Sequence, residues 1–336
     1  MNTVNKIRTA LRVKGINAGN DLRGLLGLNN SFFKEASGAR VLVYHGVCET
    51  DPTRFNSLFL SLKTFESHLQ FFKQHFHVIS LDEFYAGNFN SKRLNLCLTF
   101  DDGFANNYKY VLPLLEKYKL PASFFITAIR EAGYDILWND FLAIAQKYGP
   151  LQWEFMNDRF KKDKHNSYVS QSSGKMLKGI LRGRRFEDKA AMMRVLGSLI
   201  DIRRNASETD HWLQMTFDEI RQLSLSPLAT VGCHGYYHND LAVLEEKDIR
   251  DELVRAKNFL EHLIQKPVDA LAFPYGSYSR ATITESRKAG FSRLLAADFL
   301  FPEDRNDNGM RERFTVSPYI SVNNQMMAII HGKYPR

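Results

Sequence analysis

Short apolar runs alternate with amphipathic segments along most of the chain after residue 40. The apolar runs predict buried strands, and they lie at residues 41–45, 77–81, 94–100, 122–127, 230–234, 268–273, 292–296 and 313–320. Apolar residues spaced three or four apart predict helices at 64–75, 106–118, 245–265 and 280–289. Because each strand leads into a helix, we expect a parallel sheet or barrel.

The strand pattern stops between about residues 130 and 215. This segment is rich in Lys and Arg and predicts further helices, so we interpret it as a helical insertion in the domain. A solvated surface is the simpler explanation of its charges, and a lid or anion-binding arm over a site is the alternative.

The ends of the chain differ from the rest. Residues 1–39 mix basic residues, leucines and glycines, which indicates a basic helix and loop docked on the domain, with peripheral membrane contact as the alternative. Residues 40–325 then form the main domain, and residues 326–336 form a C-terminal tail.

Composition narrows the classes of protein that fit. The chain has 336 residues, 44% of them hydrophobic, which is enough for a large α/β core. The sequence shows neither a membrane-spanning run nor a signal-peptide pattern, so we expect a cytoplasmic protein. Cys48, Cys97 and Cys233 lie in scattered apolar contexts and predict buried thiols. The net charge of +8 favours an anionic partner, but no recognised motif points to nucleic acid.

Two adjacent carboxylates, Asp101 and Asp102, end the apolar run at 94–100 and precede Gly103. Carboxylates that ionise side by side repel each other, so one pKa must rise unless a cation absorbs the charge. The pair is therefore a candidate for a metal ligand next to a general base.

Two imidazoles, those of His234 and His238, follow the apolar run at 228–233. On one helical turn or in a tight corner, a spacing of four points both rings the same way. Imidazole nitrogen and carboxylate oxygen suit zinc and its neighbours, and three protein ligands leave a position open for water. Cys233 is a further candidate ligand or nucleophile, although strand alternation turns it away from His234.

Three motifs follow three different predicted strands. They are Thr-Phe-Asp-Asp-Gly at 99–103, His-Gly-Tyr-Tyr-His at 234–238 and Phe-Pro-Tyr-Gly at 273–276. In a parallel barrel, such strand ends share one face, where sites assemble. In these motifs, and in Tyr-His-Gly-Val at 44–47, the chain resembles the polysaccharide deacetylase family, the NodB-type carbohydrate esterases of family 4, over about residues 40–325.

The resemblance implies a distorted, incomplete (β/α) barrel of the NodB homology type with a helical insertion. It also implies that Asp102, His234 and His238 bind a divalent metal, usually Zn²⁺, with Co²⁺, Ni²⁺ or Mn²⁺ as alternatives. Asp101 would then be the general base. The backbone N–H of Tyr275, after Pro274, would stabilise the oxyanion.

Two departures from the family pattern leave roles open. Many members carry an Arg two residues before the third motif's proline, where this chain has Ala272, and Arg313 or an insertion arginine could orient the base instead. The family's late Leu-x-His motif, which supplies the general acid, has no clear match. His331 and His45 are candidates, but the first lies near the C-terminus and the second is equally consistent with a core histidine.

We therefore expect a hydrolase of carbon–nitrogen, non-peptide amide bonds. Its reaction would be metal-dependent de-N-acetylation of an amino sugar in a glycan or in a lipid- or nucleotide-linked precursor, in cell-surface polysaccharide or lipopolysaccharide biosynthesis, with release of acetate. The alternatives are an amidohydrolase of a small non-sugar amide and a non-catalytic, metal-retaining glycan-binding protein. The intact Asp101 argues against the last, because binding alone needs no base.

Overall fold

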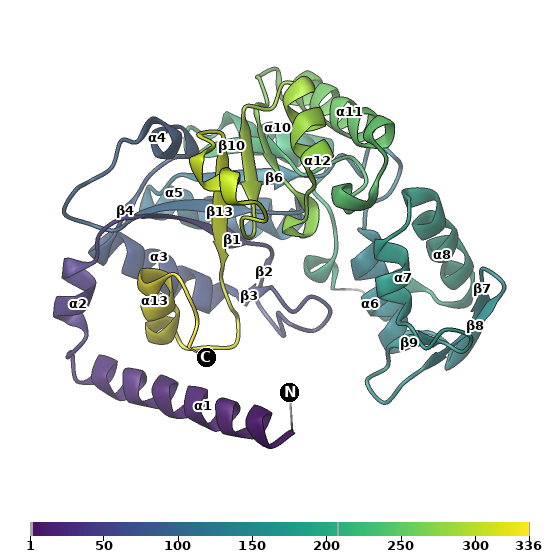
Figure 1. Ribbon diagram of the computed structural model, residues 1–336, viewed down its shortest axis with the longest axis horizontal. Coiled ribbons are helices and arrows are strands. Elements are labelled where there is room, and N and C mark those ends of the chain that lie inside the picture. Colours follow the sequence, from purple (N-terminus) through teal and green to yellow (C-terminus); the bar gives the residue numbers. More distant parts are fainter. Residues whose placement is uncertain (1–2, 207, 336) are drawn as a thin grey trace.

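Seven parallel strands form a closed ring in the computed structural model, which describes residues 3–206 and 208–335 (Figure 1). In spatial order the strands are β1 (Ala39–Tyr44), β13 (Met310–Thr315), β12 (Arg293–Ala296), β11 (Ala270–Ala272), β10 (Ala229–Cys233), β6 (Ala122–Ile126) and β5 (Asn95–Phe100), which pairs with β1 and closes the ring. A ring of seven lacks the eighth strand of a (β/α)₈ barrel. The predicted incomplete barrel is thus confirmed.

Two predicted strands differ from their predicted bounds by more than two residues. The run at 77–81 contributes only β4 (His77–Val78), which pairs with the amino end of β5. Ser80 ends its extended backbone, because its side chain and that of Glu83 form a capping box that starts α4 (Leu81–Ala86). The last strand, β13, begins at Met310 and ends at Thr315, five residues earlier than predicted.

Helices surround the ring. They are α3 (Leu62–His75), α5 (Leu112–Tyr118), α10 (Phe217–Leu225), α11 (Glu246–Ile264) and α12 (Arg280–Lys288). α11 shows why they pack on the strands, because Ile249, Leu253, Ala256 and Leu260 recur at helical spacing and are all fully buried.

Side chains along β5 point alternately outward to the helix-facing core and inward to the barrel, where the site lies. Phe100 faces the helices and stacks between Tyr44 of β1 and Phe124 of β6, with both ring centroids 5.2 Å away. Cys97 belongs instead to the cluster inside the ring. Because side chains alternate along a strand, Asp101 continues the inner row into the mouth of the barrel.

The insertion between β6 and α10 forms a second lobe with its own core, drawn in teal in Figure 1. Its helices are α6 (Trp138–Tyr148), α7 (Leu177–Arg182), α8 (Phe186–Leu199) and α9 (Ile202–Asn205). Its strands are β7 (Gln152–Phe155), β8 (Asp158–Lys162) and β9 (Tyr168–Ser170).

The prediction of a purely helical insertion is therefore wrong. β7, β8 and β9 pair as an antiparallel sheet whose buried side chains include Trp153, Phe155, Phe160 and Tyr168. In β7 these aromatics alternate with exposed Gln152 and Glu154, which is the period of a half-buried strand. The surrounding Lys and Arg residues obscured that short pattern.

The two ends of the chain lie next to each other. α1 (Thr3–Leu25) runs along the outside of the molecule beside α13 (Val322–His331), and α2 (Asn30–Glu35) joins it to β1 (Figure 1). Residues 326–331 were predicted as part of a tail, but Met326, Ala328 and Ile329 are buried on α13. Across the described part of the chain, every helix is too short or too polar to cross a membrane.

Candidate active site

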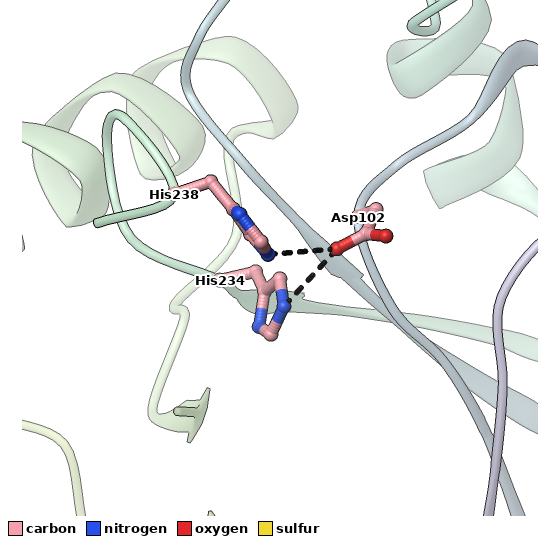
Figure 2. A group of neighbouring side chains, drawn as sticks. All are labelled: Asp102, His234 and His238. Carbon is pink, nitrogen blue, oxygen red and sulfur yellow. Dashed lines mark ion pairs between the residues drawn. The ribbon is translucent and has the colours of Figure 1, made fainter. Parts of the chain in front are cut away.

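The loops after β5 and β10 bring three predicted ligands together (Figure 2). Asp102 follows β5, and His234 and His238 follow β10. Oδ1 of Asp102 lies 3.3 Å from Nε2 of His234 and 3.1 Å from Nε2 of His238. One ligand atom from each residue lies within 4.8 Å of the others, and all three residues are buried. Residues 132 positions apart in sequence thus converge on one point.

The donor atoms fit a divalent cation. Nδ1 of His234 lies 2.8 Å from the carbonyl oxygen of Ala272, which can only accept, so Nδ1 carries a proton and Nε2 is the nitrogen that can ligate a cation. Within the described residues, the buried Oδ1 of Asp102 accepts no well-aligned hydrogen bond. Two imidazole nitrogens around such an oxygen are a donor set that zinc and its neighbours bind.

Charges around the site keep both carboxylates ionised. Burial alone would raise the pKa of Asp102, but His238 and His234 outweigh it and hold this pKa well below its ordinary value. Burial likewise opposes ionisation of Asp101, and Arg313 and His234 outweigh it and lower its pKa. Burial lowers the pKa of His238 and so favours its neutral form, whereas at His234 the charges of Asp101 and Asp102 outweigh burial and raise the pKa.

Arg313 holds Asp101 from inside the barrel. Its Nη1 and Nη2 donate to Oδ1 and Oδ2 of Asp101 at 2.7 and 2.8 Å, and Nη1 also lies 3.2 Å from Oγ1 of Thr99. The guanidinium comes from β13, whereas the family pattern has an Arg at the position of Ala272. Arg182 of the insertion instead pairs with Asp240 at 2.7 Å. Arg313 is therefore the arginine that contacts the predicted base.

Tyr275 lies in the turn Pro274–Gly276 that follows β11. Its ring centroid is 4.7 Å from that of His238, and the guanidinium of Arg182 lies 4.6 Å above it. Tyr275 lines the site cavity, whereas Pro274 is buried beside Gly235 and does not line it.

Three site residues adopt left-handed backbone conformations. The φ angles are 76° at Asp102, 56° at His238 and 61° at Tyr275. Such values are uncommon outside glycine, and strained residues gather at functional sites. These strained backbone conformations orient the three residues toward one point. The sequence alone did not reveal them.

The loop that carries both histidines rests on a buried carboxylate. Glu252 of α11 accepts from the N–H of Tyr237 at 3.1 Å and from Nδ2 of Asn239 at 2.8 Å. Gly235 has a φ of 78°, and a Cβ there would lie 3.1 Å from Oε1 of Glu252. This explains glycine where the family often has Ser or Thr.

Lys189 of α8 supports the same loop from the insertion. It is fully buried, and its Nζ donates to Oδ1 of Asn239 at 2.5 Å. Sequence reasoning missed both Lys189 and Glu252. The available signal was Glu252 itself, a charged residue between Ile249 and Leu253 on the apolar face of α11.

A cavity of about 450 Å³ opens above these residues. The barrel, the segment 53–58 and the insertion all form its wall, and the insertion contributes Asn139, Asp140, Ala143, Lys178 and Arg182. The insertion is therefore part of the site, which favours the alternative of an arm over it. Two titratable groups without an assigned role, His45 and Asp140, also line this cavity.

His45 and Asp140 have opposite electrostatic surroundings. Asp140 is 2% exposed, and burial and the charge of Asp102 raise its pKa well above the ordinary value, so it keeps its proton. Burial lowers the pKa of His45. Sequence reasoning placed His45 among the acid candidates and did not consider Asp140.

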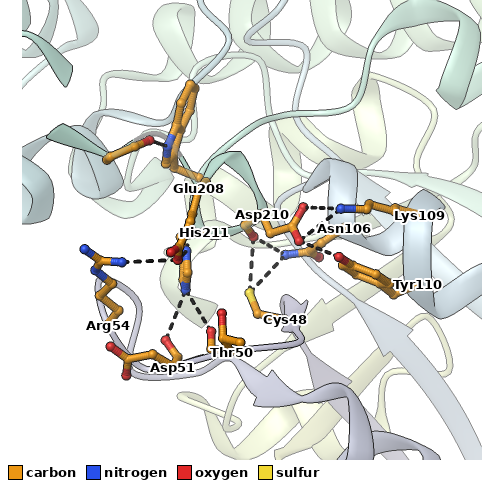
Figure 3. A network of polar contacts seen from close by, with 12 residues as sticks. Cys48, Thr50, Asp51, Arg54, Asn106, Lys109, Tyr110, Glu208, Asp210 and His211 are labelled. Carbon is orange, nitrogen blue, oxygen red and sulfur yellow. Dashed lines mark hydrogen bonds and ion pairs between the residues drawn. The ribbon is translucent and has the colours of Figure 1, made fainter. Parts of the chain in front are cut away.

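A polar network joins the segment 48–54, which leads into the 53–58 wall, to the end of the insertion (Figure 3). Nδ2 of Asn106 donates to the carbonyl oxygen of Asp210 at 2.7 Å. Nε2 of His211 lies 3.2 and 3.1 Å from the carbonyl oxygens of Thr50 and Asp51. Arg54, at the start of the wall, pairs with Glu208 at 3.1 Å, so this end of the wall is in contact with the insertion.

Two candidates lie outside this arrangement. His331 is exposed at the end of α13, with its ring centroid 5.3 Å from that of Phe32, and it is not among the described residues that line the cavity. The prediction of His331 as a candidate acid is therefore wrong. Cys233 is buried in the apolar core, and burial raises the pKa of its thiol to about 12, which disfavours the thiolate that a ligand or nucleophile needs. All three cysteines are free and buried, as predicted.

Comparison with known proteins yields one family and a set of similar folds. The profile of the family described as polysaccharide deacetylase matches residues 90–153 and 202–294. No curated protein matches the chain. The deacetylase PplD of Streptococcus pyogenes, solved with acetate, is 16% identical over 87% of this chain and 98% of that chain, with a TM-score of 0.51. IcaB from Ammonifex degensii is 18% identical over 88% and 97% of the two chains, with a TM-score of 0.54.

A polysaccharide deacetylase from Bacillus cereus is 17% identical over 88% of this chain and 69% of that chain, with a TM-score of 0.54. At these identities the solved structures show a shared fold. The profile match covers Asp101, Asp102, His234, His238 and Tyr275. The chain belongs to the polysaccharide deacetylase family and is thus a hydrolase of the amide bonds of acetylated sugars.

Proposed function

We propose that the protein removes the acetyl group from an N-acetylated amino sugar by metal-dependent hydrolysis, releasing acetate and a free amine. The observation that carries this proposal is the convergence of Asp102, His234 and His238 within 4.8 Å, with an ionised Asp101 next to them. A structural core would not need three buried ligand atoms and a spare carboxylate at one point.

Each residue then has a defined task. Asp102, His234 and His238 would hold a divalent cation, most simply Zn²⁺, which supplies Lewis acidity toward water and the amide carbonyl. Asp101 accepts the proton of the attacking water as general base, and the two hydrogen bonds from Arg313 fix its orientation. The N–H of Tyr275 donates to the developing oxyanion, a contribution of about 3 kcal/mol to transition-state stability.

The leaving amine needs a proton, which Asp140 can donate directly and which His45, whose pKa burial lowers, donates only after it has taken up a proton. Asp140 holds a proton because its pKa is raised. His45 lies at the end of β1, and its buried Nδ1 has no hydrogen-bond partner among the described residues. Both residues are candidates for the general acid.

The substrate in this proposal is a glycan or a glycan precursor on a lipid or nucleotide carrier. Such a carrier brings phosphate, and the cationic side chains of Lys178 and Arg182 in the cavity wall support that choice. The proposal places the reaction in cytoplasmic synthesis of a cell-surface polysaccharide or lipopolysaccharide. Cell fractionation tests the location.

The proposal is tested by measuring acetate release and metal content together. We expect the purified protein to contain stoichiometric metal, to release acetate from N-acetylated saccharides, and to lose this activity with a chelator. Asp101→Asn removes the base and should lower the rate by about 10²–10⁴-fold with metal still bound. The matched control is Asp218→Asn, which alters an 87% exposed carboxylate.

Two outcomes would overturn this assignment. Bound metal without acetate release from any acetylated saccharide would favour a glycan-binding protein. Turnover of small non-sugar amides alone would favour a different amidohydrolase.

A further inference from the structure

Helix α1 is attached to the molecule through its polar side. Nδ2 of Asn324 donates to the carbonyl oxygen of Asn17 at 3.0 Å, and Nδ2 of Asn323 donates to that of Asn20 at 2.8 Å. The half-buried residues Val13, Asn17, Asn20 and Gly24 follow helical spacing and form one seam against α13. A Cβ at Gly24 would overlap the side chain of Asn323, so the contact is close.

The opposite side of α1 is apolar and exposed. Leu11, Leu22 and Leu25 are 64%, 60% and 87% exposed, and Leu26, the first residue after the helix, is 62% exposed. Leu11 and Leu22 each lie two residues before a member of the seam, and two residues correspond to about 200° around a helix. A helix of a globular protein normally buries its apolar stripe. α1 buries a polar seam and presents its leucines outward.

Basic residues flank this apolar stripe. Arg8, Arg12, Lys14 and Arg23 are exposed on α1. Asp21 is the one acidic residue in the sequence of this helix, and its Oδ1 accepts a hydrogen bond from Ser321 at 2.5 Å. The outer face of α1 therefore combines exposed leucines with uncompensated positive charge.

We propose that α1 is an interfacial helix that docks the protein on an anionic lipid bilayer. The leucines would enter the boundary between headgroups and acyl chains, while the arginines and Lys14 bind lipid phosphates. A second copy of this chain fits the face less well, because stacking two such helices would bring like charges together. The helix is not apolar enough to cross the bilayer, so the contact is with its surface.

This binding is independent of catalysis and is measured without substrate. The full-length protein is sedimented with vesicles of phosphatidylcholine alone or with phosphatidylglycerol added. We expect binding to the anionic vesicles, weakening with salt, and little binding to the neutral ones.

Substitutions on α1 separate the apolar and electrostatic contributions. Combining Leu11→Gln, Leu22→Gln and Leu25→Gln preserves helix propensity and should weaken vesicle binding by about tenfold or more. The matched control carries Leu151→Gln, Leu225→Gln and Leu300→Gln, at sites that are 75%, 68% and 55% exposed elsewhere on the surface. Combining Arg8→Gln, Arg12→Gln and Arg23→Gln should remove the preference for anionic lipid.

Circular dichroism and a thermal melt establish that each variant is folded. Equal vesicle binding by the α1 triple variant and its control would overturn the proposal, as would no binding by the wild type. A dimer in solution that the α1 leucine substitutions abolish, without vesicle binding, would also overturn it and assign the face to a second copy.

Discussion

Asp101 is a buried carboxylate whose charge is favoured chiefly by Arg313, and this gives a first prediction at the residue scale. Arg313→Gln removes the guanidinium that lowers the pKa of Asp101, so burial would raise that pKa. At a given pH less of the base is ionised, and the acidic limb of the rate–pH profile should move to higher pH. We expect kcat to fall by about 10–100-fold.

Arg313→Lys tests orientation separately from charge. Lysine keeps the positive charge but cannot form the two parallel hydrogen bonds that the guanidinium makes. The acidic limb of the rate–pH profile of Arg313→Lys should therefore shift less from the wild-type position than that of Arg313→Gln. Metal content, measured in all three proteins, should stay unchanged. An unshifted profile in Arg313→Gln would contradict the role of Arg313.

The general acid can be identified by changing how much the leaving group needs a proton. Asp140→Asn and His45→Gln each remove one candidate while conserving side-chain shape. Loss of the true acid should lower the rate on an N-acetyl sugar by about 10²–10⁴-fold, yet leave hydrolysis of an aryl acetate nearly unaffected, because its phenolate departs without protonation. A variant that loses both activities equally has a structural defect, and the remaining candidate is then tested alone.

The predicted metal ligands could be found from the sequence, whereas the residues that surround and position them could not. Asp102, His234 and His238 could be found because their types and spacing recur in motifs at strand ends. The contact of Arg313 with Asp101 depends on β13 lying next to β1, which only the closed ring determines. Asp140 and Glu252 gave no motif, because their importance comes from burial beside the site.

At the scale of elements, α8 places a charge beneath the loop that carries His238. Burial lowers the pKa of Lys189 to about 8, whereas the ordinary value is 10.5. Above pH 8 the folded protein releases this proton before the unfolded chain does, so the unfolded chain binds more protons and the free energy of unfolding rises with pH. The gain is complete near pH 10.5 and absent below pH 8.

We therefore expect wild type to gain about 3 kcal/mol relative to Lys189→Met between pH 8 and 10.5. Denaturant unfolding at several pH values measures this difference. The control is Lys164→Met, an exposed lysine of the same insertion, whose difference from wild type should not change with pH over this range. Parallel curves for wild type and Lys189→Met would show that Lys189 is not buried as a cation.

The elements themselves were predictable where apolar runs were long enough to stand out. The barrel strands are nearly continuous buried runs, as in β5, where all six residues are buried. The sheet β7–β9 was missed because only alternate residues of its strands face the small core of the insertion. Strand ends shifted where a cap such as Ser80 redirected the backbone.

At the scale of the whole molecule, the insertion and the barrel share one cavity, so we expect the insertion to contribute to substrate selection. Lys178 is exposed on α7 and lines the cavity, whereas Arg182 of the same helix is engaged with Asp240 and Tyr275. Lys178 is therefore the free cation of this pair, available to bind an anionic group on the substrate.

Lys178→Gln should raise KM for an N-acetyl amino sugar carried on a nucleotide diphosphate by about 3–10-fold, because one charge-assisted hydrogen bond is lost. Its kcat should change little, since the side chain is not among the residues at the metal-binding cluster. KM for a neutral N-acetylated oligosaccharide should stay the same. Lys164→Gln, an exposed lysine of the same lobe, is the control. An equal rise in KM for neutral and phosphate-bearing substrates would show that the cavity wall selects substrates by shape. It would contradict the inference that Lys178 binds the phosphate of a carrier.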